Sequence, residues 1–76
     1  MLYKVKATWR DEDINLFIGC EDEAVHTVLA LQDNGIKSLI EGTVDHPIKR
    51  NTYQQRLVEE MLAFVNYDYV DDPVLH

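Results

Sequence analysis

Residues 3–20 read YKVKATWRDEDINLFIGC, and this stretch decides the fold. Its first part alternates between apolar and polar side chains. The apolar positions are Tyr3, Val5, Ala7 and Trp9, and the polar ones are Lys4, Lys6, Thr8 and Arg10. A period of two is typical of a strand that buries one face.

A second alternating set follows the acidic run Asp11-Glu12-Asp13. Its apolar members are Ile14, Leu16, Ile18 and Cys20. We expect a hairpin with an even number of loop residues, because an odd loop would place apolar side chains opposite basic ones. The expected cross-strand pairs are Trp9 with Leu16, Ala7 with Ile18, and Val5 with Cys20.

Two helices and one more strand follow. Glu21, Asp22 and Glu23 open the first helix, where carboxylates favour the positive end of the helix dipole, and Asn34-Gly35 ends it. Its apolar stripe is Ala24, Val25, Val28 and Leu31, flanked by Leu29.

Residues 36–44 read as a strand. The second helix is expected to begin near Asn51 or Thr52, with Thr52 and Gln55 as a capping box, and its apolar face is Tyr53, Leu57, Met61, Phe64 and Val65.

This order predicts a small two-layer α+β sandwich, β-β-α-β-α, with a three-stranded antiparallel sheet in the order 2-1-3 and two helices on one face. We expect residues 1–66 to form a single domain and residues 67–76 to form an acidic, aromatic C-terminal tail. The opposite face of the sheet is expected to carry Lys4, Lys6, Thr8, Arg10, Asn15 and Phe17.

Composition narrows the class of protein. The chain of 76 residues has 14 Asp and Glu against 7 Lys and Arg, a net charge of -7, with 46% hydrophobic residues and one cysteine. Such a charge favours a basic partner over nucleic acid or anionic lipid. The lone cysteine, together with the lack of a signal sequence or long apolar run, predicts a cytoplasmic protein without membrane contact.

The sequence shows no equipment for catalysis or for holding a cofactor. Cys20 and Ser38 are the conceivable nucleophiles, and His26 and His46 the conceivable bases, but no triad signature joins them. The Asp22/His26 pair falls short of a metal-binding pattern, since zinc sites need closely spaced pairs of Cys or His. We therefore predict a non-enzymatic protein with no cofactor and no metal.

The acidic clusters suggest a recognition surface for another protein, a basic one. The predicted partner-binding residues are Asp11, Glu12, Asp13, Glu21, Asp22 and Glu23, with Tyr67 and Tyr69 as aromatic anchors. The two clusters lie at opposite ends of the second strand, roughly 20–23 Å apart. At this spacing they would imitate a run of phosphates and occupy the nucleic-acid-binding surface of the partner as a DNA mimic.

Two alternatives stay open. One is a self-associating structural domain, a homodimer that buries the second helix or the tail. The other is a sheet face that binds RNA or single-stranded DNA through Lys4, Lys6, Arg10 and Phe17, although the strongly negative total makes direct nucleic-acid binding the less favoured reading. In size and charge alone, the chain is similar to the small inhibitors that bacteriophages encode against host machinery.

Overall fold

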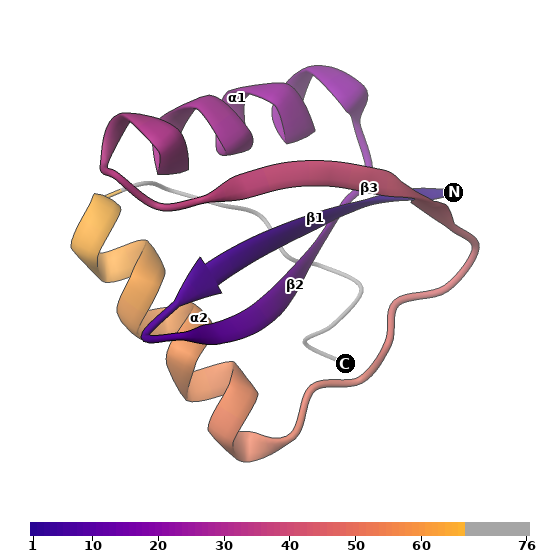
Figure 1. The fold of residues 1–76 in the computed structure, drawn as a ribbon. Helices are drawn as coiled ribbons and strands as arrows, with labels where there is room; N and C mark the ends of the chain where they lie inside the picture. Colours follow the sequence, from indigo (N-terminus) through magenta and orange to yellow (C-terminus); the bar gives the residue numbers. More distant parts are fainter. Residues whose placement is uncertain (67–76) are drawn as a thin grey trace.

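The computed structural model describes residues 1–66. Their secondary-structure elements follow one another in the order β-β-α-β-α (Figure 1). The elements are β1 (Leu2–Trp9), β2 (Glu12–Ile18), α1 (Glu21–Asp33), β3 (Ser38–Val44) and α2 (Thr52–Val65). The strands form an antiparallel sheet in the order β2-β1-β3. The predicted α+β architecture and strand order are confirmed.

The hairpin has a loop with an even number of residues, as expected, but its turn lies earlier in the chain than predicted. Arg10 and Asp11 alone form its turn, and both have positive φ angles, 54° and 63°. This left-handed pair is the geometry of a type I′ turn, which matches the twist of the flanking strands. The strand therefore resumes at Glu12, and the acidic run does not form a longer loop.

The predicted register is wrong as a consequence of this turn. The observed pairs are Trp9 with Glu12, Ala7 with Ile14, and Val5 with Leu16. The displacement is an even number of residues, so apolar side chains still oppose apolar ones on one face of the sheet. Cys20 has no place in the ladder, and it is exposed instead of lying on the apolar side of β2.

One hydrophobic core joins the sheet to both helices. Its buried members are Val5, Ala7, Ile14, Leu16, Ile18, Ala24, Leu31, Ile36, Leu57, Val58 and Met61. α1 and α2 contribute to the same cluster as the inward residues of β1 and β2, so both helices cover one face of the sheet, as predicted. Burial of these side chains supplies the main stabilisation of the fold.

The buried stripe of α1 is rotated from its predicted position. Ala24, Thr27 and Leu31 are buried, whereas Val25 and Leu29 are exposed. Thr27 tolerates burial because its hydroxyl donates to the Glu23 carbonyl oxygen at 2.7 Å. The apolar pattern misled the prediction because it counted Thr27 as polar, although its hydroxyl is satisfied within the helix and the residue is buried.

A tight closure of α1 delays the start of the third strand. Gly35 has a φ of 77°, and the amide of Ile36 donates to the Leu31 carbonyl oxygen at 2.9 Å. These features are those of a helix end closed by a left-handed glycine. Ile36 is thus buried in the core as part of the helix end, and β3 begins at Ser38 instead of residue 36.

The second helix begins at Thr52, as predicted, but with a different cap. Asn51 is the N-cap: its side chain accepts from the Gln54 amide at 2.8 Å, and the Gln54 side chain accepts from the Asn51 amide at 3.3 Å. The capping box is therefore Asn51 with Gln54 and not Thr52 with Gln55. Of the predicted apolar face, Tyr53 and Phe64 are exposed.

The second face of the sheet is not the open basic surface that the alternation predicted. Phe17 is buried at 1% exposure and lines a small cavity of about 60 Å³ with Ile48 and Arg50, which belong to the connection between β3 and α2. Lys4 forms an ion pair with Glu41 at 3.3 Å. The aromatic platform on which the RNA interpretation depended is therefore covered.

Candidate functional site

Aromatic side chains of β1 and α2 meet beside the hairpin turn. Trp9 lies at the end of β1, and its ring centroid is 5.2 Å from that of Phe64 on α2, with the planes tilted by 48°. The Trp9 Nε1 donates to a Glu60 carboxylate oxygen at 3.5 Å. Phe64 remains 59% exposed despite this contact. An aromatic pair held by a neighbouring helix and still open to solvent is typical of protein-binding surfaces.

Arg10 joins this group from the turn. Its guanidinium carbon lies 5.9 Å from the centroid of the Trp9 ring, and its Nε is 3.3 Å from the same Glu60 oxygen that accepts from Trp9. Glu60 thus holds a tryptophan and an arginine in fixed positions. Tryptophan and arginine are the residue types most enriched among those that dominate binding energy.

The acidic residues of the turn divide into two kinds. Asp13 is tied to the sheet, because it accepts from the Thr8 hydroxyl at 3.2 Å and lies 3.6 Å from Nζ of Lys6. Asp11 and Glu12 are exposed, and within residues 1–66 no hydrogen bond or ion pair holds their carboxylates. We call Trp9, Arg10, Asp11, Glu12 and Phe64 the hairpin-tip surface.

The second predicted acidic cluster lies at the opposite end of β2, in the first turn of α1. Tyr3 donates its hydroxyl to Glu21 at 3.4 Å, while Asp22 and Glu23 are exposed. The half-buried position of Tyr3 raises the pKa of its hydroxyl, and the negative charge of Glu21 and this hydrogen bond raise it further. The clusters do not converge, and the first turn of α1 has a structural use for its charges.

Sequence reasoning found part of this surface and missed its aromatic half. It named Asp11 and Glu12, and it placed Trp9 and Phe64 on the apolar faces of their elements. Trp9 is indeed partly buried and packed against the core, whereas Phe64 is 59% exposed. One available signal was the spacing of Glu60 and Phe64, which lie at i and i+4 and so share one side of α2. Tyr67 and Tyr69, predicted as anchors, lie outside the described residues.

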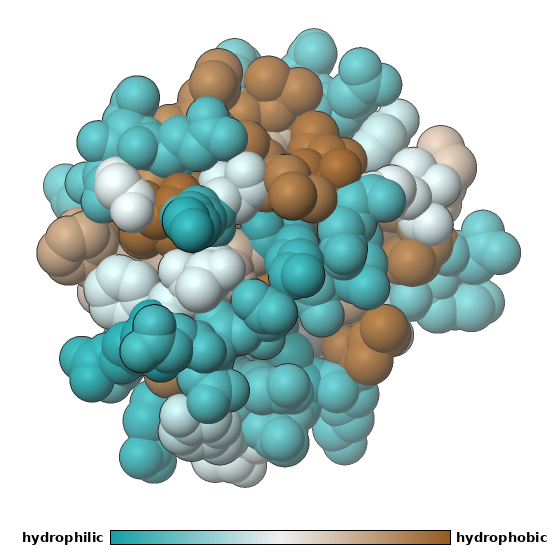
Figure 2. Space-filling model, viewed as in Figure 1, coloured by the Kyte–Doolittle hydropathy of each residue, from teal (hydrophilic) through white to brown (hydrophobic). Residues whose placement is uncertain are grey.

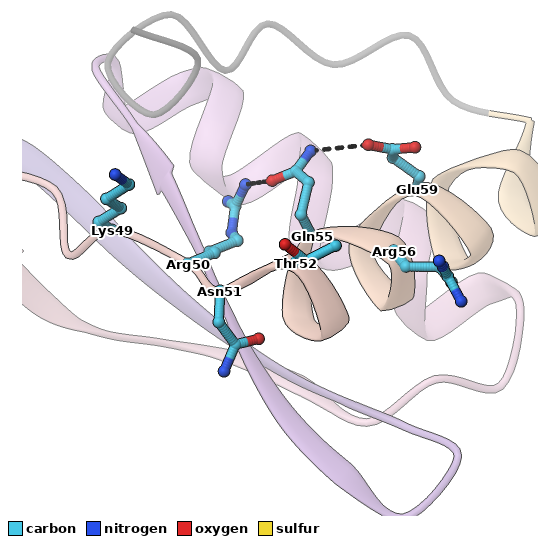
Figure 3. Close-up of a pocket in the computed structure, with 7 residues that line it drawn as sticks. All are labelled: Lys49, Arg50, Asn51, Thr52, Gln55, Arg56 and Glu59. Atoms are coloured by element: carbon cyan, nitrogen blue, oxygen red, sulfur yellow. Dashed lines mark hydrogen bonds between the residues drawn. The ribbon is translucent and has the colours of Figure 1, made fainter.

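A larger hollow of about 520 Å³ lies at the start of α2, lined by Lys49, Arg50, Asn51, Thr52, Gln55, Arg56 and Glu59 (Figure 3). A chain of hydrogen bonds crosses it: Arg50 donates to Gln55 at 2.9 Å, and Gln55 donates to Glu59 at 3.0 Å. Figure 3 shows Arg56 extending away from this chain. Three of the lining residues, Arg50, Gln55 and Glu59, bind one another. We interpret this hydrogen-bonded chain as a contact that holds the start of α2 in place.

The residues that were weighed for catalysis or metal binding form no cluster of that kind among residues 1–66. No group of three His, Cys, Asp or Glu side chains lies close enough there to hold a metal ion. The Ser38 hydroxyl donates to the Val28 carbonyl oxygen at 3.2 Å, and Cys20 is exposed at the start of α1. Across the same residues, neither helix has the length and apolar character needed to cross a membrane.

Comparisons with known proteins do not extend this description. No protein-family model, no curated protein and no solved structure matches the chain.

Proposed function

We propose that this protein is a small binding module that recognises a basic partner protein through the hairpin-tip surface. The observation that carries the proposal is the combination at one place of a partly buried tryptophan in contact with an exposed phenylalanine and of two exposed carboxylates that have no partner within residues 1–66. Aromatic side chains supply buried area on binding, and carboxylates steer a positively charged partner and set its orientation.

The tight turn supports this role. Arg10 and Asp11 are both in the left-handed conformation, the geometry of a two-residue turn that continues the twist of β1 and β2. Trp9 and Arg10 are held further by Glu60. Binding groups that are already fixed lose less conformational entropy on association, so more of their contact energy appears as affinity.

In its more specific form, the proposal makes the partner a nucleic-acid-binding protein and the module its inhibitor, of the kind that bacteriophages encode. Asp11 and Glu12 at one end of β2 and Asp22 and Glu23 at the other are separated by roughly 20–23 Å, the length of a seven-residue strand. Carboxylates at this spacing suit a basic groove that otherwise binds phosphates. A cytoplasmic location is part of this form of the proposal.

The decisive experiment compares affinity columns that carry the protein and its variants, loaded with lysate and eluted with a salt gradient. The test variant Asp11→Asn/Glu12→Gln removes two charges, and asparagine keeps the left-handed conformation accessible at position 11. The control Asp33→Asn/Asp45→Asn removes two exposed charges elsewhere. Phe64→Ala tests the aromatic half.

The proposal requires a partner that the unmodified protein retains and that the tip variants release at lower salt. We expect the dissociation constant for the partner to rise about tenfold for each tip variant, because these residues are at the centre of the proposed contact. For the control it should rise less than about twofold, because the charges that it removes are remote from the contact. Equal retention by the tip variants and the control would contradict the hairpin-tip surface as the binding site. A further variant, Asp22→Asn/Glu23→Gln, tests the two-cluster form: unchanged affinity would remove the second cluster from the site.

A further inference from the structure

The two outer edges of the sheet differ in how far other segments of residues 1–66 cover them. At the edge of β2, Arg50 donates from Nε and from a terminal nitrogen to the Asn15 carbonyl oxygen, at 3.1 and 3.0 Å. The connection before α2 thus covers that edge. At the edge of β3, among the described residues, the protecting hydrogen bond is that from the Gln32 side chain to the Ser38 carbonyl oxygen, at 3.1 Å. An uncovered strand edge is a template for pairing with another chain.

The register identifies which backbone groups of β3 point outward. The Thr8 amide donates to the Lys37 carbonyl oxygen at 3.0 Å, so Lys37 faces β1. The ladder is regular from Ser38 to Ile40, and a register irregularity follows, because Lys4 pairs with Gly42. Within the regular part residues alternate, and Leu39 therefore also faces β1, opposite Lys6. Ser38 and Ile40 direct their amides and carbonyls away from the sheet, which agrees with the contact from Gln32.

Exposed apolar side chains flank this open edge. Val25 and Leu29 of α1 are 40% and 50% exposed, and Leu39 of β3 is 52% exposed. Val25 and Leu29 lie on the flank of α1 that faces β3, since Ser38 contacts the neighbouring Val28. Figure 2 shows apolar atoms gathered over α1 and β3 at the top of the view. Leu39 is paired with Lys6 and so lies on the face of the sheet away from the helices, whereas α1 lies on the face that carries Val5. The edge of β3 is therefore bordered by exposed apolar side chains on both faces, and exposed apolar side chains gathered at one place mark an interaction site.

We propose that a second copy of the chain pairs with this edge, β3 against β3 in antiparallel fashion, with the two-fold axis at Leu39. Ser38 of each copy then exchanges hydrogen bonds with Ile40 of the other, and both have the outward orientation this requires. The Ser38 carbonyl oxygen accepts the new bond with its second lone pair, beside the bond from Gln32. Lys37 of each copy lies opposite Glu41 of the other and adds to the ion pair that Glu41 forms with Lys4 of its own chain. The two Leu39 side chains meet at the axis. The pairing satisfies backbone, charge and apolar groups together.

Neighbouring registers are less complementary. An axis at Lys37 sets two lysines against each other, and an axis at Glu41 does the same with two glutamates. An axis at Ile40 places Leu39 opposite Glu41, and an axis at Ser38 places it opposite Lys37. Like charges and apolar–charged pairs directly across strands are unfavourable, so the Leu39 axis is selected.

The helices fit the same arrangement. α1 packs chiefly over β3 and β1. Neighbouring strands are about 4.8 Å apart, so the two-fold axis of the dimer lies half a spacing outside β3. The helix, centred half a spacing inside β3, therefore runs about 5 Å from the two-fold axis. The two α1 helices then lie about 10 Å apart on one face of a continuous sheet, which is a normal helix-packing distance. Val25 and Leu29 of the two copies meet there. By contrast, the exposed aromatics of α2, Tyr53 and Phe64, are separated by about three turns and form no continuous patch.

Charge opposes this association and sets its strength. Each copy has a net charge of -7, so the copies repel one another at low salt. We expect a dissociation constant in the micromolar range that falls as salt is added, because screening weakens the long-range repulsion. Binding of a basic partner at the hairpin-tip surface has the opposite salt dependence, so the two proposals are tested separately and either one stands without the other.

A crosslinking experiment tests the register. In a Cys20→Ser background, Leu39→Cys places two thiols at the axis in a non-hydrogen-bonded pair, with Cα atoms about 4.5 Å apart, a separation a disulfide spans. The control is Ile48→Cys, at a site of similar exposure, 57% against 52%. Under mild oxidation we expect the Leu39→Cys protein to form covalent dimers at least tenfold faster. Equal rates would overturn the proposed axis.

Sedimentation velocity over about 1 to 500 µM tests the association itself. Lys37→Glu should raise the dissociation constant about tenfold, since both cross-strand ion pairs become repulsive, and adding Glu41→Lys should restore it. Lys49→Glu makes the same charge change away from the edge and should leave the constant within about twofold of the unmodified protein. A protein that stays monomeric throughout this range, at low and high salt, would overturn the proposal.

Discussion

Cys20 was assigned to the second strand because the apolar alternation of residues 14–18 was extended to it, and this assignment is wrong. The residue is the N-cap of α1, with an extended backbone at φ -130° and ψ 135°, and its side chain makes no capping hydrogen bond. Glu23 occupies the third helical position, where a glutamate completes a capping box with a serine or threonine. The local sequence would therefore form a complete capping box if residue 20 had a hydroxyl in place of its thiol.

Replacing Cys20 by serine should stabilise the protein. The hydroxyl can accept from the Glu23 amide, and we expect the free energy of unfolding to rise by about 0.5–1 kcal/mol. Urea denaturation followed by circular dichroism measures the change. Cys20→Ala is the matched control, and it should show no gain. If alanine and serine behave alike, the assigned cap is wrong.

Tyr3 should ionise at a higher pH than an ordinary tyrosine. Its half-buried position, and then the charge of Glu21 and their hydrogen bond, raise its pKa. A group whose pKa is raised on folding stabilises the protein below its unfolded pKa, about 10, and that stability is lost as pH rises through the folded value. The stability difference between the protein and Tyr3→Phe should thus shrink above about pH 10.

The titration of Tyr3 can be isolated by subtracting the ultraviolet titration of Tyr3→Phe from that of the unmodified protein. Glu21→Gln removes the charge and should move the Tyr3 titration to lower pH. A titration of Tyr3 that does not respond to Glu21→Gln would show that the carboxylate plays no part in the raised pKa.

Among the elements, the connection between β3 and α2 does more than its sequence indicates. Arg50 anchors it by donating to the Asn15 carbonyl oxygen and to Gln55, and this contact lies beside buried Phe17. Arginine suits the position because its planar group can form several hydrogen bonds in fixed directions. Lysine keeps the charge but cannot reproduce that set.

We therefore expect Arg50→Lys to lower the free energy of unfolding by about 1–3 kcal/mol, the range for hydrogen bonds that involve a charged group. Arg56→Lys makes the same chemical change on an exposed face of α2, where no hydrogen bond or ion pair to residues 1–66 holds the side chain, and it should change stability by less than about 0.5 kcal/mol. Chemical denaturation of both variants provides the comparison. Equal effects would mean that the anchoring bonds contribute nothing beyond charge.

Local pattern predicted the elements well and their mutual alignment poorly. Alternation identified both strands of the hairpin, and the acidic first turn identified α1, because these signals lie within a few residues of each other. The register depended on whether Arg10 and Asp11 adopt left-handed angles, which these residue types do not favour strongly. The exposure of Val25 depended on how far the sheet extends beneath α1.

At the scale of the whole molecule, negative charge dominates. Residues 1–66 pair some of their carboxylates, such as Glu41 with Lys4, but Asp11, Glu12, Asp22 and Glu23 remain exposed. Self-repulsion of a net charge of -7 works against the compact state. Screening this repulsion should help the folded protein more than it harms exposed ion pairs, which contribute little.

Added salt should therefore raise the melting temperature. Moving from about 20 mM to about 0.5 M sodium chloride shortens the screening length several-fold, and we expect an increase of a few degrees. Differential scanning calorimetry at low protein concentration, where self-association is negligible, measures it. Asp11→Asn/Glu12→Gln should reduce the dependence. A melting temperature that falls with salt would show that local ion pairs outweigh the net repulsion.

The sequence by itself determined the order of elements, the strand order of the sheet, and the face of the sheet that both helices cover. These follow from periodicity and helix ends, which are local properties of the chain. Only the tertiary structure decided that Phe17 is covered, that Trp9 and Phe64 meet at the hairpin tip, and that no other strand of residues 1–66 pairs with the outer edge of β3. Each depends on which distant segments come into contact, and no local pattern in one chain encodes that.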